Sequence, residues 1–133
     1  MNKRCEYTKN IASMYRYHIV FCSRYRRRIF AIEGVEARFK ELVRQICGQN
    51  NIEVLAMNCC EDYCHLYIGP PPNISPADAM KLIKSSTTAP LRKEFQSLSR
   101  CPTIWTRNYL VSTEANLSEE TIQAFVDRQK RRK

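Results

Sequence analysis

The side chains best able to do chemistry gather in one stretch, residues 59–68, which reads Cys-Cys-Glu-Asp-Tyr-Cys-His-Leu-Tyr-Ile. In an extended strand successive side chains point to opposite faces, so Tyr63, His65 and Tyr67 share one face. The residues between them suit a buried face. A histidine with an acid just upstream, Asp62, can take part in holding a divalent metal. The stretch therefore predicts a strand with one functional face and one core face.

The elements before and around this stretch are two strands and a helix. Aromatic and β-branched residues over 15–22 predict a first strand. Apolar residues spaced by three and four over 35–49 predict an amphipathic helix. Residues 52–58 predict a second strand that turns into the strand at 63–68 as its hairpin partner.

The second half of the chain repeats this alternation. Ser75 is expected to cap a helix that Pro90 should kink or split before residues 91–95. Residues 104–113 predict a fourth strand, and Ser118 is expected to cap a final helix.

The order of these elements is that of the ferredoxin-like, split βαβ plan in the α+β class. We expect a four-stranded antiparallel sheet with helices on one face and an added C-terminal helix beside the other face, which stays free for a ligand or a second subunit. The chain is expected to be one domain, 1–133, with flexible ends at 1–12 and 130–133.

Composition favours a polyanionic partner. The 133 residues carry 22 Lys+Arg against 13 Asp+Glu, a formal net charge of +9, and nucleic acid is the leading candidate. No apolar run is long enough to span a bilayer and the N-terminus lacks a secretory signal, so a cytoplasmic protein is expected. The seven cysteines are expected to be free thiols there.

Three blocks of sequence point to one family. They are residues 17–28, with Tyr-His-Ile-Val-Phe before Tyr-Arg-Arg-Arg, residues 59–66, and residues 105–111, which read Trp-Thr-Arg-Asn-Tyr-Leu-Val. In this order and spacing they resemble the small single-tyrosine HUH transposases of bacterial and archaeal insertion sequences. The resemblance runs from about Tyr15 to Gln129.

The resemblance implies a dimer with a ferredoxin-like core that binds single-stranded DNA hairpins. In such enzymes a tyrosine on the last helix attacks a phosphate and forms a 5′-phosphotyrosine link. A Mg²⁺ or Mn²⁺ ion, held by two histidines and a glutamine, polarises that phosphate.

Carried onto this chain, the family pattern is incomplete. The second histidine of the pair is His65 and the glutamine is Gln129, with Asp62 as a further candidate ligand. The first histidine falls on Tyr63, and the nucleophile falls on Phe125. Phenylalanine has no hydroxyl, and a neutral phenol is a poor replacement for an imidazole ligand. The glycine of the family's mobile connection to the last helix falls on Ala115.

We therefore expect a DNA-binding protein with impaired or absent strand cleavage. The side chains predicted to contact DNA are Arg24, Arg26, Arg27, Arg28, Lys84 and Arg107. Two alternatives stay open: an active transposase with a rearranged site, and a regulator that binds nucleic-acid hairpins on an open sheet face.

Some neighbouring residues have simpler interpretations. His18, inside an aromatic strand, is expected to be a hydrogen-bonded core histidine. A zinc site at Cys59, Cys60, Cys64 and His65 is disfavoured because strand alternation separates the sulfurs. Trp105 suits either base stacking or the core.

Overall fold

A four-stranded antiparallel sheet forms the centre of the protein, with strand order β2-β3-β1-β4. The computed structural model describes residues 16–129, so the ends predicted to be flexible, as well as Tyr15, lie outside the described residues. The strands are β1 (Tyr17–Ser23), β2 (Glu53–Cys59), β3 (Tyr63–Gly69) and β4 (Trp105–Ser112). Each strand begins and ends within two residues of its predicted position where the chain is described.

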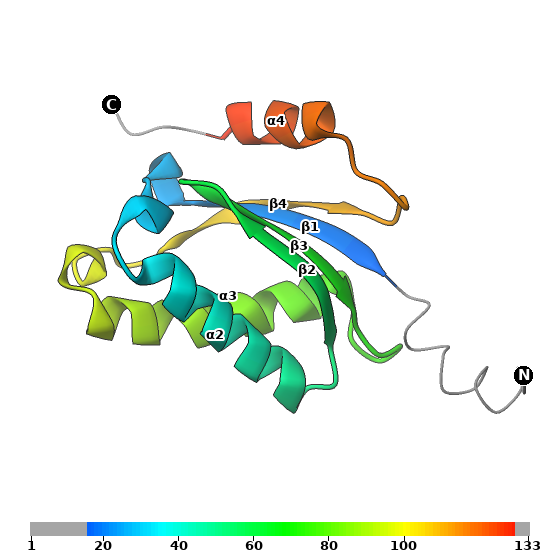
Figure 1. Cartoon of the computed structure of the whole chain (residues 1–133), viewed down its shortest axis with the longest axis horizontal. Helices are drawn as coiled ribbons and strands as arrows, with labels where there is room; N and C mark the ends of the chain where they lie inside the picture. Colours follow the sequence, from blue (N-terminus) through cyan, green and yellow to red (C-terminus); the bar gives the residue numbers. More distant parts are fainter. Residues whose placement is uncertain (1–15, 130–133) are drawn as a thin grey trace, which may run out of the picture.

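The helices lie on both faces of this sheet. Figure 1 shows α2 (Val35–Gln49) and α3 (Pro76–Glu94) side by side under one face, and α4 (Glu119–Asp127) over the other. Short 3-10 turns, η1 (Arg24–Arg26), η2 (Ile29–Ala31) and η3 (Gln96–Leu98), connect these elements. The predicted α+β, ferredoxin-like plan with an added C-terminal helix is confirmed.

The main core lies between the sheet and the helices α2 and α3. Phe21, Phe39 and Trp105 meet there, with ring centroids 5.1 Å apart between Phe21 and Trp105 and 5.3 Å apart between Phe39 and Trp105. Trp105 is 3% exposed and its Nε1 donates to Thr87 Oγ1 at 3.0 Å. The tryptophan is therefore a core residue and is not free to stack on bases.

Helix α3 corrects one prediction. Ser75 caps it through a capping box with Asp78, as expected, but the helix continues through Pro90 to Glu94 without a split. A proline inside a helix removes one hydrogen bond. Burial of Thr87 and Leu91, the residues on either side of this turn, holds the chain helical there.

Helix α4 corrects a second expectation, because it lies across the sheet face that was predicted to stay free. Ser118 caps this helix by accepting a hydrogen bond from the Thr121 backbone N–H at 3.1 Å, as expected. Its buried residues pack on β1 in a second apolar cluster, which consists of Val20, Cys22, Ile122, Phe125 and Val126. Burying side chains of the size of Ile or Phe stabilises the folded state by about 1.5–3 kcal/mol each.

Within the described range, no helix has the length and apolarity that a membrane span requires.

Candidate functional site

The polar face of β3 lies under α4, as strand alternation predicted. Tyr63, His65 and Tyr67 are partly buried on this face, whereas Cys64, Leu66 and Ile68 are fully buried against α2 and α3. Antiparallel pairing with β1 and β2 on either side fixes this orientation.

A pocket of about 670 Å³ opens between the β2–β3 hairpin and the first turns of α4. Its lining combines amides, carboxylates, a thiol, a phenol and an imidazole with two apolar side chains. The lining residues are Asn58, Cys60, Tyr63, His65, Leu117, Glu119, Glu120, Ile122 and Gln123. The pocket thus contains two of the predicted site residues, and it carries negative rather than positive charge.

His65 is tied to a second histidine. His18 Nδ1 lies 2.9 Å from His65 Nε2, and His18 Nε2 lies 3.3 Å from the Ala115 carbonyl oxygen. Because a carbonyl can only accept, His18 donates from Nε2; when its ring is neutral, its Nδ1 accepts the hydrogen bond that His65 donates from Nε2. Tyr67 stacks on His18 with ring centroids 4.2 Å apart.

This arrangement holds His65 neutral. Burial, and next the neighbouring His18, lower the pKa of His65 from its ordinary value. His18 itself is 7% exposed, so it is the buried, hydrogen-bonded histidine that the sequence predicted. Its contact with His65 was not predicted.

Asp62 is engaged by an arginine. Arg26 Nε lies 3.1 Å from Asp62 Oδ2, with side-chain exposures of 10% and 13%, and Arg26 Nη1 lies 4.0 Å from Asp127 Oδ1. The pair connects η1, the hairpin turn and α4. Arg26, predicted to contact DNA, therefore makes an internal ion pair instead of facing solvent.

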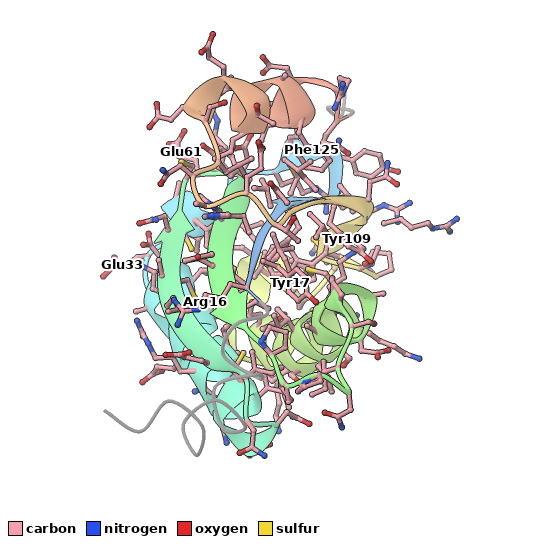
Figure 2. The ribbon with its side chains drawn as sticks, turned by 90° about the vertical axis from the view of Figure 1, so that its right-hand side faces the viewer. Arg16, Tyr17, Glu33, Glu61, Tyr109 and Phe125 are labelled. Carbon is pink, nitrogen blue, oxygen red and sulfur yellow. The ribbon has the colours of Figure 1, made fainter. Side chains whose placement is uncertain are left out.

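The two residues to which the resemblance assigns the nucleophile and the glutamine, Phe125 and Gln129, have different surroundings. Phe125 is 6% exposed and lies between α4 and the sheet (Figure 2). Gln129 lies beyond the end of α4, where its Nε2 donates to the Phe125 carbonyl oxygen at 3.1 Å. Tyr63 packs against the same apolar cluster as Phe125, and burial raises the pKa of its phenol, which stays neutral.

The residues that the resemblance assigns to the metal do not form a ligand set here. His65 donates to His18, Asp62 pairs with Arg26, and the Gln129 amide caps a helix carbonyl. Within residues 16–129, no three His, Cys, Asp or Glu side chains are grouped so that they could hold a metal ion. This arrangement of donors does not fit Mg²⁺ or Mn²⁺.

A second feature is a basic surface at the end of the sheet where β1 ends and β4 begins. Three neighbouring hollows of about 580, 470 and 290 Å³ share residues, and no acidic side chain lines any of them. We call this the basic surface and define it by its cations, which are Arg24, Arg27, Arg28, Lys84, Arg92, Arg100 and Arg107.

The cations of the basic surface are held in place by other contacts. Lys84 Nζ donates to the Thr106 carbonyl at 2.6 Å, and burial lowers its pKa. Arg24 and Arg27 both lie over the Tyr25 ring. In the described part of the chain, the buried Nε of Arg92 has no hydrogen-bond acceptor.

The basic surface brings together five of the six predicted DNA-binding residues, all except Arg26, and adds Arg92 and Arg100.

Glu119, Glu120 and Gln123 are the polar pocket residues of α4, and sequence reasoning did not predict them as site residues. They line the pocket because α4 lies over this sheet face with its first turns beside residues of β2 and β3. Nothing in the local sequence fixes that placement.

Comparison with known proteins agrees with this fold and with the sequence blocks. The family model described as "Transposase IS200 like" matches residues 11–129. The transposase for insertion sequence element IS200 of Salmonella typhimurium is 33% identical over 101 residues, which are 74% of this chain and 66% of that protein. The ISDra2 transposase TnpA of Deinococcus radiodurans is 24% identical over 116 residues, or 85% of this chain and 82% of that protein.

Solved structures share the fold. A crystal structure of a putative transposase from Deinococcus radiodurans R1 has a TM-score of 0.77 and 26% identity, covering 88% of this chain and 92% of that one. A REP-associated tyrosine transposase bound to a REP hairpin has a TM-score of 0.56 at 12% identity, covering 86% and 64%. The chain belongs to the IS200-like transposase family, the single-tyrosine HUH transposases of insertion sequences.

Proposed function

We propose that this protein binds single-stranded DNA hairpins and does not cleave them. The observation that carries the proposal is Phe125, which occupies the nucleophile position and is buried against β1. A phosphotyrosine link needs a hydroxyl oxygen, and phenylalanine has none. The neutral phenol of Tyr63 stands at the first histidine position, so the second requirement of the reaction is weakened as well.

The arrangement of donors supports the same proposal. The family uses a divalent ion as a Lewis acid on the phosphate. In this chain His65, Asp62 and Gln129 each bond to another protein group, and they would have to exchange those partners to bind an ion. The carboxylates of Glu119 and Glu120 beside the pocket also repel a phosphate in the absence of a cation.

The basic surface supports DNA binding. Its cations line connected hollows in which no acidic side chain takes part, and within the described range only Arg28 among them is paired with an acid at the rim, Glu61 at 3.8 Å. Such a lining suits the phosphates of a folded strand. A REP-associated transposase with the same fold is bound to a hairpin. Phosphate contacts set the position of a strand but carry little sequence information. The basic surface therefore accounts for the affinity for DNA and does not account for the choice of one hairpin sequence over another.

We also propose a homodimer, as the family resemblance implies. The connection from β4 to α4 carries Ala115 in place of glycine, and His18 bonds to its carbonyl. We expect a stiffer connection than the family's and a dimer of fixed arrangement. Sedimentation equilibrium would give the oligomeric state directly, and a monomer at all concentrations would contradict this part.

The test of the function uses wild-type protein, Mg²⁺ or Mn²⁺, and a labelled single strand with the hairpins that flank the gene. We expect a shifted band on a native gel and no covalent protein–DNA adduct on a denaturing gel. The matched control is the same strand with its stem mispaired, which should bind more weakly. An adduct would contradict the loss of cleavage, and equal binding of both strands would contradict hairpin recognition.

Two further arms separate the alternatives. If an adduct forms, Tyr63→Phe and Tyr67→Phe variants identify the tyrosine that carries it. Competition between DNA and RNA hairpins of the same sequence separates a DNA-binding protein from an RNA-binding regulator, because A-form stems and 2′-hydroxyls present a different surface.

A further inference from the structure

Two cysteines face each other across the hairpin that carries the polar face. Cys59 on β2 is the register partner of Cys64 on β3. The turn is closed by a hydrogen bond from the Cys60 backbone N–H to the Tyr63 carbonyl at 2.9 Å, so Cys60 and Tyr63 form the hydrogen-bonded pair. The next pair, Cys59 and Cys64, is then a non-hydrogen-bonded pair, whose Cα atoms are about 4.5 Å apart in antiparallel sheets. Disulfides span Cα separations of about 4.4–6.8 Å.

The two thiols also lie on the same side of the sheet. Cys64 is fully buried in the main core, and Cys59 is partly buried at the edge of the same core. A hydrogen bond with Cys59 contributes, after burial, to raising the pKa of the Cys64 thiol. The sulfurs are therefore neighbours, and both are free thiols in this structure.

The remaining described cysteines are placed differently. Cys60 is exposed on the opposite face, where it lines the pocket. Cys22 belongs to the second apolar cluster, Cys47 is buried on α2, and Cys101 accepts a hydrogen bond from Arg27. Among residues 16–129, Cys59 and Cys64 are the only two cysteines paired in register across the sheet.

We propose that Cys59 and Cys64 are a redox-active pair that closes to a disulfide by exchange with a small-molecule disulfide such as oxidised glutathione. The Cys59 thiolate, the more accessible of the two, attacks one glutathione sulfur and expels the other as a thiolate. The Cys64 thiolate then attacks the Cys59 sulfur and expels the second glutathione. Two protein thiols are oxidised to one disulfide, and one oxidised glutathione is reduced to two thiols, which take up the two protons.

The bond would fasten the hairpin next to the pocket without entering it. Both thiols lie on the core side of the sheet, which α2 and α3 cover, whereas Tyr63 and His65 line the pocket beside α4. The closed loop is short, so its effect on the unfolded chain is small. We expect the main effect on local opening of the hairpin, seen as slower hydrogen exchange of the β2 and β3 amides in the oxidised protein.

The experiment treats the full chain with oxidised glutathione at mildly alkaline pH, blocks remaining thiols with N-ethylmaleimide under denaturing conditions, and measures intact mass. Apart from any cysteine that retains glutathione, wild-type protein should take up two fewer N-ethylmaleimide groups than reduced protein, with no glutathione on Cys59 or Cys64. Cys60→Ser is the matched control and should behave the same, because a Cys59–Cys60 or Cys60–Cys64 bond would be lost in it.

Cys59→Ser and Cys64→Ala should both fail to form the disulfide. Cys59 is only partly buried, so Cys59→Ser should leave the fold intact even if Cys64→Ala disturbs the core. The proposal is overturned if wild-type protein keeps every thiol, if peptide mass mapping finds glutathione attached to Cys59 or Cys64, or if Cys59→Ser still forms an internal disulfide. It is also overturned if Cys60→Ser abolishes the bond.

Discussion

The neutral state of His65 makes stability depend on pH. Its pKa is lowered in the folded protein by burial and by His18, so below the ordinary histidine pKa of about 6.5 the unfolded chain binds more protons than the folded one. This contribution to stability is present above that pH and is lost as the pH falls towards the lowered, folded-state value. We expect the urea midpoint to decrease between neutral pH and pH values below 6.5.

The control for this prediction is His65→Gln, which keeps a hydrogen-bond donor but cannot titrate. The variant should show a smaller decrease of the urea midpoint over the same interval. An equal decrease in both proteins would assign the effect to other groups.

Phe125, to which the family resemblance assigns the nucleophile position, is predicted to stabilise the folded state through its buried ring. Phe125→Ala leaves a cavity between α4 and β1 and should cost about 3–5 kcal/mol if the chain unfolds as one unit. The matched control, Gln123→Ala on the exposed side of the same helix, should change the free energy of unfolding by about 0.5 kcal/mol or less. Chemical denaturation measures both, and equal effects would contradict the assignment.

At the scale of single residues, the sequence predicted orientation better than contacts. Alternation along a strand placed Tyr63, His65 and Tyr67 on one face because that rule is local. The bond between His18 and His65 depends on how β1 and β3 pair, and the sequence leaves that register open. The partner of Asp62 was missed for a similar reason, since a run of arginines gives no sign of which member turns inward.

The N-cap of α3 is a local feature that can be tested by itself. The Ser75 hydroxyl accepts from the Asp78 backbone N–H at 3.0 Å, and the Asp78 side chain accepts from the Ser75 N–H. Ser75→Ala should cost about 0.5–2 kcal/mol of stability, because it leaves a helix N–H without its partner. Thermal unfolding measures the effect against Ser97→Ala, an exposed serine outside the main helices. No difference between the variants would contradict the role of the cap.

At the scale of elements, the sequence signals for where helices begin predicted the structure correctly, but the signal for a helix end at Pro90 did not. Ser75 and Ser118 cap their helices as predicted, since capping involves residues only three positions apart. Pro90 was expected to interrupt α3, but the helix is long and its last turns pack on the core through Thr87 and Leu91. The packing of these residues on the core outweighs the hydrogen bond that Pro90 removes. The size of this packing contribution cannot be predicted from the sequence pattern of the helix alone.

For the whole molecule, the order of elements predicted the sheet and the two helices beneath it, but not the position of α4. That helix has one apolar side, and the sequence allows this side to meet its own sheet or another copy of the chain. In the structure it covers Val20 and Cys22 of its own β1. The sheet face proposed as an open stacking platform is therefore partly covered, and the basic surface is the larger cationic area left for DNA.

DNA binding should depend on where the cations lie on the protein, and not only on its net charge. The variant Arg24→Ala/Arg107→Ala removes two cations of the basic surface and lowers the formal net charge from +9 to +7. The control Arg38→Ala/Lys40→Ala lowers it equally, but on α2, where both side chains pair with glutamates. For single strands, each lost phosphate contact makes the slope of log K against log salt less steep by about 0.7. We expect a change of about 1.4 for two contacts in the first variant and almost none in the control, measured by fluorescence anisotropy across a salt series. Equal changes in both would mean that net charge alone attracts the strand, and the basic surface would then lose its assigned role.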